Sequence, residues 1–202
     1  ASSASEMVTE LVQYLGENAI GRLEADALLA GITLDTKNFV LKTGVRTFEA
    51  AAFLRRKGAD TVEVKRLFSN SIDTYRAKYQ LVSNAEIYNS CAVTAADEDC
   101  PDIRIASAQA ADELLGVQGV NASFVLYSSA GTVNISARSM GDFNVQLVME
   151  ALGGGGHLTM AGALLKHTSM EEAKRRLMEA IDGHLEARER SLAAQLQQND
   201  TI

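Results

Sequence analysis

The chain has 202 residues, of which 47% are hydrophobic, and its 19 basic and 26 acidic side chains give a formal net charge of −7. A chain of this length can bury a substantial core in one large or two small domains, and its negative charge argues against binding to long nucleic acids. With a single proline and 5% aromatic residues, the composition favours an α/β or α+β protein over a β-sandwich or a disordered chain.

The cysteines and the hydropathy pattern bear on the cellular compartment. Cys91 and Cys100 form neither a metal-ligand pattern nor a disulfide framework, which is typical of a protein in a reducing cytosol. No hydrophobic segment approaches the ~20 residues of a membrane span. We therefore expect a cytoplasmic chain without membrane contact of its own. Because it begins with Ala1 rather than methionine and enters a helix almost at once, we also expect it to be cut from a longer protein.

The first helix is well signalled. Ser3 and Glu6 have the spacing of a capping box, and Gly16 is placed to end the helix. One face carries the apolar residues that we expect to point inward, namely Val8, Leu11, Val12 and Leu15.

Helical patterns continue through the first 65 or so residues. A second helix is expected from about Leu23 to Ala30 and should end at Gly31, which places Asp35 in the loop that follows. A third runs from near Thr47 to residue 58, and Asp60 caps the helix after it. Residues 66–84 are typical of a helical linker.

The pattern changes near residue 85, where short apolar segments begin. We expect strands at 87–93, 103–105, 122–127, 133–138 and 161–165, and helices at 108–115 and 170–185. The two middle strands are joined by a turn containing Gly131, as in a β-hairpin. These elements indicate a mixed sheet in a second domain over residues 85–190, followed by a frayed polar tail over 191–202.

A run of four glycines, Gly153, Gly154, Gly155 and Gly156, followed by His157, is the most informative segment. Glycine loses more backbone freedom on folding than any other residue, so the run calls for a reason. We favour the interpretation that phosphate oxygens approach the backbone amides of this run closely. Two alternatives remain: the end of the helix that precedes the run, and a flexible connector. A Walker loop is excluded, because there the glycines precede a helix.

Few other residues offer chemistry. Arg138 could bind a phosphate bidentately, although a surface arginine is the simpler reading. His157 could act as a general acid, a phosphate donor or a metal ligand, or be a satisfied polar residue. Asn144 is accounted for as a helix cap. Asp35 is a possible metal ligand, and the acidic segment 97–99 reads as a solvated cluster to which we assign no role.

Four segments in order resemble the DHH-type phosphoesterases. They are ALLAGITLDTKNF (27–39), TGVRTFEAA (43–51), NISARS (134–139) and NVQLVMEALGGGGH (144–157). Within this family the chain is most similar to the GdpP-type (YybT) cyclic-di-AMP phosphodiesterases, over residues 1 to about 185. The resemblance implies the C-terminal part of a mainly helical DHH catalytic lobe over 1–65, then a smaller α/β DHH-associated substrate-binding domain.

The resemblance also implies a reaction and a site. In the intact parent, two Mn²⁺ ions would serve the hydrolysis of cyclic di-AMP to linear pApA. Asp35 matches the last metal-ligand aspartate, and Arg138 matches a phosphate-contacting arginine. The glycine run with His157 matches the substrate-binding GGGH motif, with His157 also taken as catalytic. Ser136 and Asn144, in the same matched segments, complete the expected substrate site.

The sequence departs from the family pattern in its metal ligands. Neither the His-x-Asp-x-Asp ligands nor the Asp-His-His signature occurs, and one carboxylate cannot hold a metal pair. We therefore expect this chain alone to be inactive and its parent to be a membrane-anchored phosphodiesterase. Two alternatives are a nucleotide-binding or assembly module without turnover, and an enzyme for short oligonucleotides or nucleotide bisphosphates. Apolar helix faces at Leu11, Val12, Leu15 and Leu28 favour a homodimer.

Overall fold

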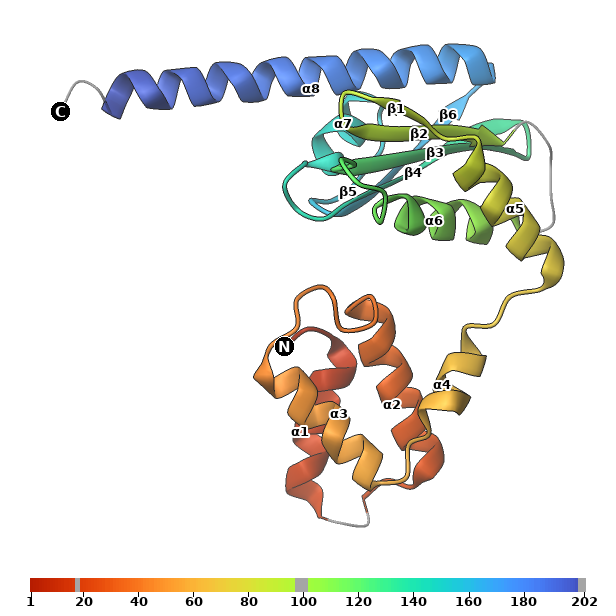
Figure 1. Ribbon diagram of the computed structural model, residues 1–202, viewed down its shortest axis with the longest axis vertical. Coiled ribbons are helices and arrows are strands. Elements are labelled where there is room, and N and C mark those ends of the chain that lie inside the picture. Colours follow the sequence, from red (N-terminus) through yellow and green to blue (C-terminus); the bar gives the residue numbers. More distant parts are fainter. Residues whose placement is uncertain (17–18, 97–101, 200–202) are drawn as a thin grey trace. The chain divides into compact units, whose positions relative to one another are not determined.

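The computed structural model describes residues 1–16, 19–96 and 102–199, so the acidic segment 97–99 and Cys100 lie outside the described residues. The chain divides into two compact units, residues 1–70 and residues 71–202 (Figure 1). The division falls within the segment that the sequence suggested as a linker, and each unit has a hydrophobic core of its own.

All the regular secondary structure in the described residues of the first unit is helical. Its elements are α1 (Ala4–Leu15), α2 (Arg22–Asp35), α3 (Val45–Arg56) and α4 (Thr61–Leu67). Leu29, Ile32, Leu54 and Val64 form the centre of its core. The expected caps are present, since the Ser3 Oγ accepts from the Glu6 amide and Asp60 accepts from the amide of Val62.

Helix α2 is longer than expected, and its Gly31 has a different role. We expected the helix to end at Gly31, but it continues to Asp35, which is its last residue rather than part of a loop. A Cβ atom at Gly31 would lie 2.0 Å from the Ser5 Oγ on α1. Glycine is therefore required here because the two helices approach closely, and the prediction of a helix end was wrong.

The buried face of α1 also differs from the expected one. Val12 is buried as predicted, but Leu11 and Leu15 are 65% and 76% exposed. Glu6 is buried instead, because its carboxylate accepts hydrogen bonds from Ser2 at the start of the chain and from the Thr47 Oγ1 on α3, the latter at 2.8 Å. Burial raises the pKa of Glu6, but these hydrogen bonds to the charged form outweigh it and hold the pKa below its ordinary value.

Glu6→Gln is expected to destabilise the first unit by about 1–3 kcal/mol, because it weakens hydrogen bonds to a buried charged group. Since the native pKa is lowered, the stabilisation is present above the ordinary value of 4.5 and is lost as the pH falls through the native pKa. Thermal unfolding at pH 7 and at about pH 3 measures both effects. The exposed Glu49→Gln serves as control, and an equal loss in both variants would contradict the assignment.

The second unit is a six-stranded mixed sheet with helices on both faces. Its helices are α5 (Ile72–Ser83), α6 (Ile103–Leu114), α7 (Val145–Ala151) and α8 (Met170–Asn199). Its strands are β1 (Glu86–Tyr88), β2 (Cys91–Ala96), β3 (Ala122–Ser129), β4 (Thr132–Ser139), β5 (Gly155–His157) and β6 (Met160–Lys166). The strand order is β1-β2-β3-β4-β6-β5, in which only β2 and β3 are parallel neighbours.

The two faces of this sheet are covered to different extents. On one face α7 and α8 pack against a large core that includes Phe124, Ile135, Met149 and Leu177. On the other face α5 and α6 cover β2 and β3, as Figure 1 shows below the sheet. Side chains of β6 on this second face are exposed, Leu164 among them at 49%. Part of the second face is thus left open to solvent.

Several elements of this unit match the predictions from the sequence, and others do not. The hairpin is confirmed, with a tight turn at Ala130 and Gly131, whose φ angles are 50° and 73°. The expected strand at 103–105 is wrong, because these residues form the first turn of α6, whose buried residues Ile103, Ala106 and Ala110 recur at helical spacing. Helix α8 continues to Asn199, past residue 185 where we expected it to end.

In the part of the chain that the structure describes, no helix combines the length and apolar character needed to cross a bilayer.

Candidate functional site

Strand β4 carries a polar row on the partly open face of the sheet. Its burial alternates along the strand, as expected when successive side chains point to opposite faces. The buried row against α7 and α8 is Val133, Ile135 and Ala137. The polar row is Thr132, Asn134, Ser136 and Arg138.

The strand register extends this polar face to the glycine run. Ser136 pairs with Gly162 on β6, which pairs with Gly155 on β5. Arg138 pairs in the same way with Met160, and Met160 with His157. Directly paired residues share a face of the sheet. Ser136, Arg138, Gly155 and His157 therefore lie on one face, although two different strands, β4 and β5, supply them.

The structure gives different explanations for the individual glycines of the run. Gly153 follows α7 with a φ of 78°, so the helix-end interpretation holds for it. A Cβ atom at Gly154 would lie 2.2 Å from the Gly162 carbonyl oxygen, and one at Gly156 would lie 2.4 Å from the Ala161 Cα. These two allow β5 to approach β6 closely. The segment is a paired edge strand rather than the flexible connector that the sequence left open.

Gly155 is the exception within the run. No atom lies within 4 Å of a Cβ atom built there, and its φ is not positive. The fold therefore places no steric demand for glycine at this position. Because Gly155 and Gly162 are adjacent on the open face, they leave a floor of bare backbone beside the Ser136 hydroxyl. A ligand can approach the main chain closely at this point.

Arg138 is more constrained than a surface arginine. Its side chain is only 12% exposed, and its Nε lies 3.2 Å from Asp112 Oδ1 on α6, without the geometry of a hydrogen bond. Its Nη1 donates to the Ala137 carbonyl oxygen at 2.9 Å. These contacts fix the direction of the guanidinium group. The interpretation of Arg138 as a simple surface arginine is therefore wrong. The residue has a structural role, independent of any contact with a ligand.

The remaining expected site residues are more dispersed. His157 is exposed on the edge strand, whereas the Asn144 side chain caps α7 by accepting from the Gln146 amide at 3.1 Å. Asp35 belongs to the other unit, at the exposed end of α2. It is followed by a left-handed turn that begins with Lys37 and Asn38, whose φ angles are 50° and 57°. The structure thus brings together Ser136, Arg138, Gly155 and His157 on one face.

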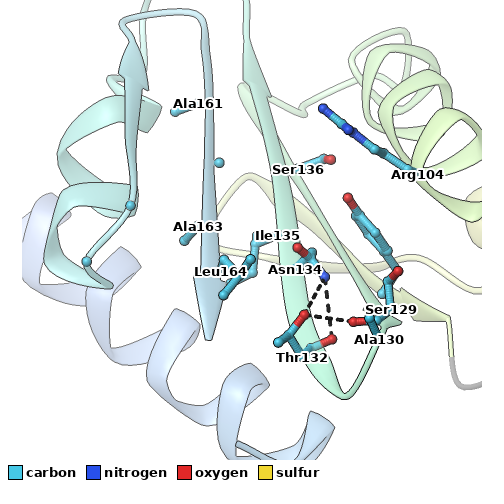
Figure 2. Close-up of a pocket in the computed structure, with 14 residues that line it drawn as sticks. Arg104, Ser129, Ala130, Thr132, Asn134, Ile135, Ser136, Ala161, Ala163 and Leu164 are labelled. Carbon is cyan, nitrogen blue, oxygen red and sulfur yellow. Dashed lines mark hydrogen bonds between the residues drawn. The ribbon is translucent and has the colours of Figure 1, made fainter. Parts of the chain in front are cut away.

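A depression of about 730 Å³ lies on the same face, within the size range of small-molecule sites. Ser136, Asn134, Gly153 and Gly154 contribute to it, as does Arg104, which we had not singled out. Figure 2 shows the Arg104 side chain extending from α6 toward Ser136. The sequence reading missed it because a strand was expected at 103–105; a helical pattern starting at Ile103 was the available signal.

The described residues do not fit a complete metal site. Among residues 1–16, 19–96 and 102–199, no three His, Cys, Asp or Glu side chains gather closely enough to hold an ion. Asp35 offers one carboxylate, whereas Mn²⁺ requires several oxygen or nitrogen ligands. No chemical step can be derived through a metal from the groups present.

Comparison with known proteins agrees with this architecture. A model of the DHHA1 domain matches residues 91–187. Over 92% of its length the chain is 49% identical to the cyclic-di-AMP phosphodiesterase GdpP of Geobacillus thermodenitrificans, and over 91% it is 46% identical to the cyclic-di-AMP phosphodiesterase PdeA of Listeria monocytogenes. It spans only 29% and 28% of these two relatives.

A solved structure is similar across both units. An exopolyphosphatase-related protein from Bacteroides fragilis matches 91% of this chain with a TM-score of 0.82 and 25% identity, and the match covers 57% of that protein. This chain and that protein share a fold over most of this chain. Residues 91–187 thus match the DHHA1 domain, and most of the chain is similar in sequence to the cyclic-di-AMP phosphodiesterases GdpP and PdeA.

Proposed function

We propose that residues 71–202 are the substrate-binding domain of a phosphodiesterase that hydrolyses cyclic di-AMP to linear pApA. The names of the relatives from Geobacillus and Listeria support this substrate class. The observation that carries the proposal is the open polar face, on which the Ser136–Gly162–Gly155 row lies next to the row of Arg138 and His157.

The chemistry of this face suits a phosphodiester. The bare backbone of Gly155 and Gly162 lets a phosphate approach the main chain, and the Ser136 hydroxyl can donate to one of its oxygens. His157, at the edge of the same face, is exposed and can donate a hydrogen bond or a proton to the bound diester. We therefore propose His157 as the catalytic contact, with Arg138 adding positive charge beside it.

The metal ions are proposed for the whole enzyme rather than for this chain alone. We propose that two Mn²⁺ ions serve the reaction and that Asp35 contributes one oxygen ligand, with the other ligands supplied from outside these 202 residues. When bound, such ions would activate water and neutralise charge at phosphorus. This chain alone should accordingly bind the dinucleotide without hydrolysing it. The membrane anchorage of the parent rests on the resemblance alone and stays a prediction.

Isothermal titration of cyclic di-AMP into this chain tests the proposal. His157→Asn is expected to weaken binding about tenfold, since it removes a hydrogen bond to a charged ligand. His167→Asn, at the exposed histidine after β6, is the matched control and should bind normally. Added Mn²⁺ should leave the affinity unchanged. No binding by the folded wild-type chain would contradict the proposal.

Arg138→Ala extends the same titration, with a check on folding. The substitution removes the ion pair between Arg138 and Asp112, so the melting temperature must be measured for this variant. Weaker binding without unfolding supports a direct contact. Short oligonucleotides and nucleotide bisphosphates titrated in parallel test the other substrate class, and tighter binding of either would replace cyclic di-AMP as the proposed substrate.

An assembly role has one specific observation in its favour. The outer face of α1 exposes Leu11, Tyr14 and Leu15 at 65%, 88% and 76%, which is unusual for apolar side chains on one helix. We propose that this chain forms a homodimer through that face. Light scattering at micromolar concentration should give twice the monomer mass, and Leu11→Lys should restore the monomer; a monomeric wild type would contradict the proposal.

A further inference from the structure

The depression on the open face has an unusual charge for this protein. Its described lining consists of hydroxyl, amide, apolar and glycine residues together with a single charged group, Arg104. The chain as a whole carries a net charge of −7. A positively charged pocket on a negatively charged protein favours an anionic ligand over a neutral one.

Arg104 is placed to act as the charged contact. It is exposed in the first turn of α6 and lines the depression. Its charge acts on the Tyr127 hydroxyl, which lines the same depression; burial raises the pKa of Tyr127 and Arg104 partly offsets this rise. The tyrosine is therefore neutral at pH 7 and is available as a hydrogen-bond donor beside the guanidinium group.

The neighbouring polar groups are donors as well. The Asn134 amide and the Ser129 and Ser136 hydroxyls line the depression, and Figure 2 shows Arg104 directed across it toward Ser136. Such a set of a guanidinium group with hydroxyl and amide groups is well suited to phosphate oxygens. A nucleobase alone would not require the positive charge.

The position of the depression relates it to the phosphodiester site proposed above. Ser136 and Arg138 are two residues apart on β4, so their rows are separated by about 7 Å along the strand. This is roughly the separation of successive phosphates in an unstacked dinucleotide. A ligand with one phosphoryl group beside Arg138 and His157 can thus place its second in the depression.

We infer that Arg104 contacts the second phosphoryl group of the dinucleotide and makes this face select dinucleotides over mononucleotides. The inference rests on the proposed function and adds a specificity-determining residue to it. The first phosphoryl group lies beside Arg138 and His157, and the second is held by Arg104 together with the Ser136 hydroxyl and the bare backbone of Gly162 in the same row. A mononucleotide fills only one of the two positions.

Titration of linear pApA and of AMP into wild-type chain and variants tests this inference. Arg104→Gln should weaken pApA binding about tenfold, as expected for an exposed charge-assisted contact, and leave AMP binding nearly unchanged. The ratio of the two affinities therefore falls. Arg188→Gln, which removes the same charge from α8 on the opposite face of the sheet, is the control and should keep the wild-type ratio.

The outcomes separate this inference from the proposed function. If wild type and Arg104→Gln bind pApA equally, Arg104 is not a phosphate contact and the inference fails, while the proposed function stands. If Arg104→Gln weakens AMP and pApA alike, there is no second phosphate position and the inference also fails. If the folded wild type binds neither ligand, the proposed function itself is contradicted.

Discussion

Gly155→Ala is expected to weaken cyclic di-AMP binding at least tenfold while leaving the melting temperature nearly unchanged. The position tolerates a methyl group, because nothing lies within 4 Å of a Cβ atom there and its φ is not positive. That methyl group would stand on the open face beside Ser136 and Gly162, where the ligand must approach the backbone. Titration calorimetry and thermal unfolding of the same preparation measure both quantities.

This variant separates a ligand-binding glycine from a structural one. If Gly155→Ala binds normally, the bare backbone floor is not used by the ligand, and the glycine run is explained by packing alone. If the variant unfolds, the position has a steric demand that the structure does not contain. Only lost binding with retained stability agrees with the proposal.

Gly156→Ala is expected to destabilise the second unit by about 2–4 kcal/mol, the largest stability effect we expect in the chain. The new Cβ atom would lie 2.4 Å from the Ala161 Cα and 2.5 Å from the Met160 carbonyl oxygen, and both are main-chain atoms that cannot move aside. Its φ of 150° adds strain for any residue with a side chain. Urea unfolding followed by circular dichroism measures the loss.

Gly183→Ala provides the control for that experiment. It lies inside α8, and nothing lies within 4 Å of its added Cβ atom. Alanine is favoured over glycine in a helix, so this change should stabilise the unit by up to about 1 kcal/mol. Equal stabilities of the Gly156 and Gly183 variants would show that β5 does not pack against β6 as described.

Local patterns predicted much of the fold. The hairpin was predictable because Gly131 marks a tight turn between two alternating strands, and the caps at Ser3 and Asp60 follow from side-chain chemistry close in the sequence. Gly31 was misread, because whether a glycine ends a helix or admits a neighbouring one depends on Ser5 of another helix. Sequence spacing contains no information on that distance.

The candidate site was likewise predictable only where local sequence determines it. The glycine run and Arg138 stood out in the sequence, but their common face depends on the β4-β6-β5 register, which pairs residues that are not neighbours in the chain. Arg104 was missed because the short apolar segment at 103–105 was interpreted as a strand. These residues instead belong to helix α6, which buries Ala106 and Ala110. Packing between residues that are distant in the sequence thus determined the features that local sequence patterns could not predict.

The most direct test of the central claim is an amide chemical-shift titration of the ¹⁵N-labelled chain with cyclic di-AMP. We expect the largest shift changes on Ser136, Gly155, His157 and Gly162, which the register places on one face. Changes confined to residues 1–70, or no changes at saturating ligand with the chain folded, would contradict a substrate-binding role for the DHHA1 domain.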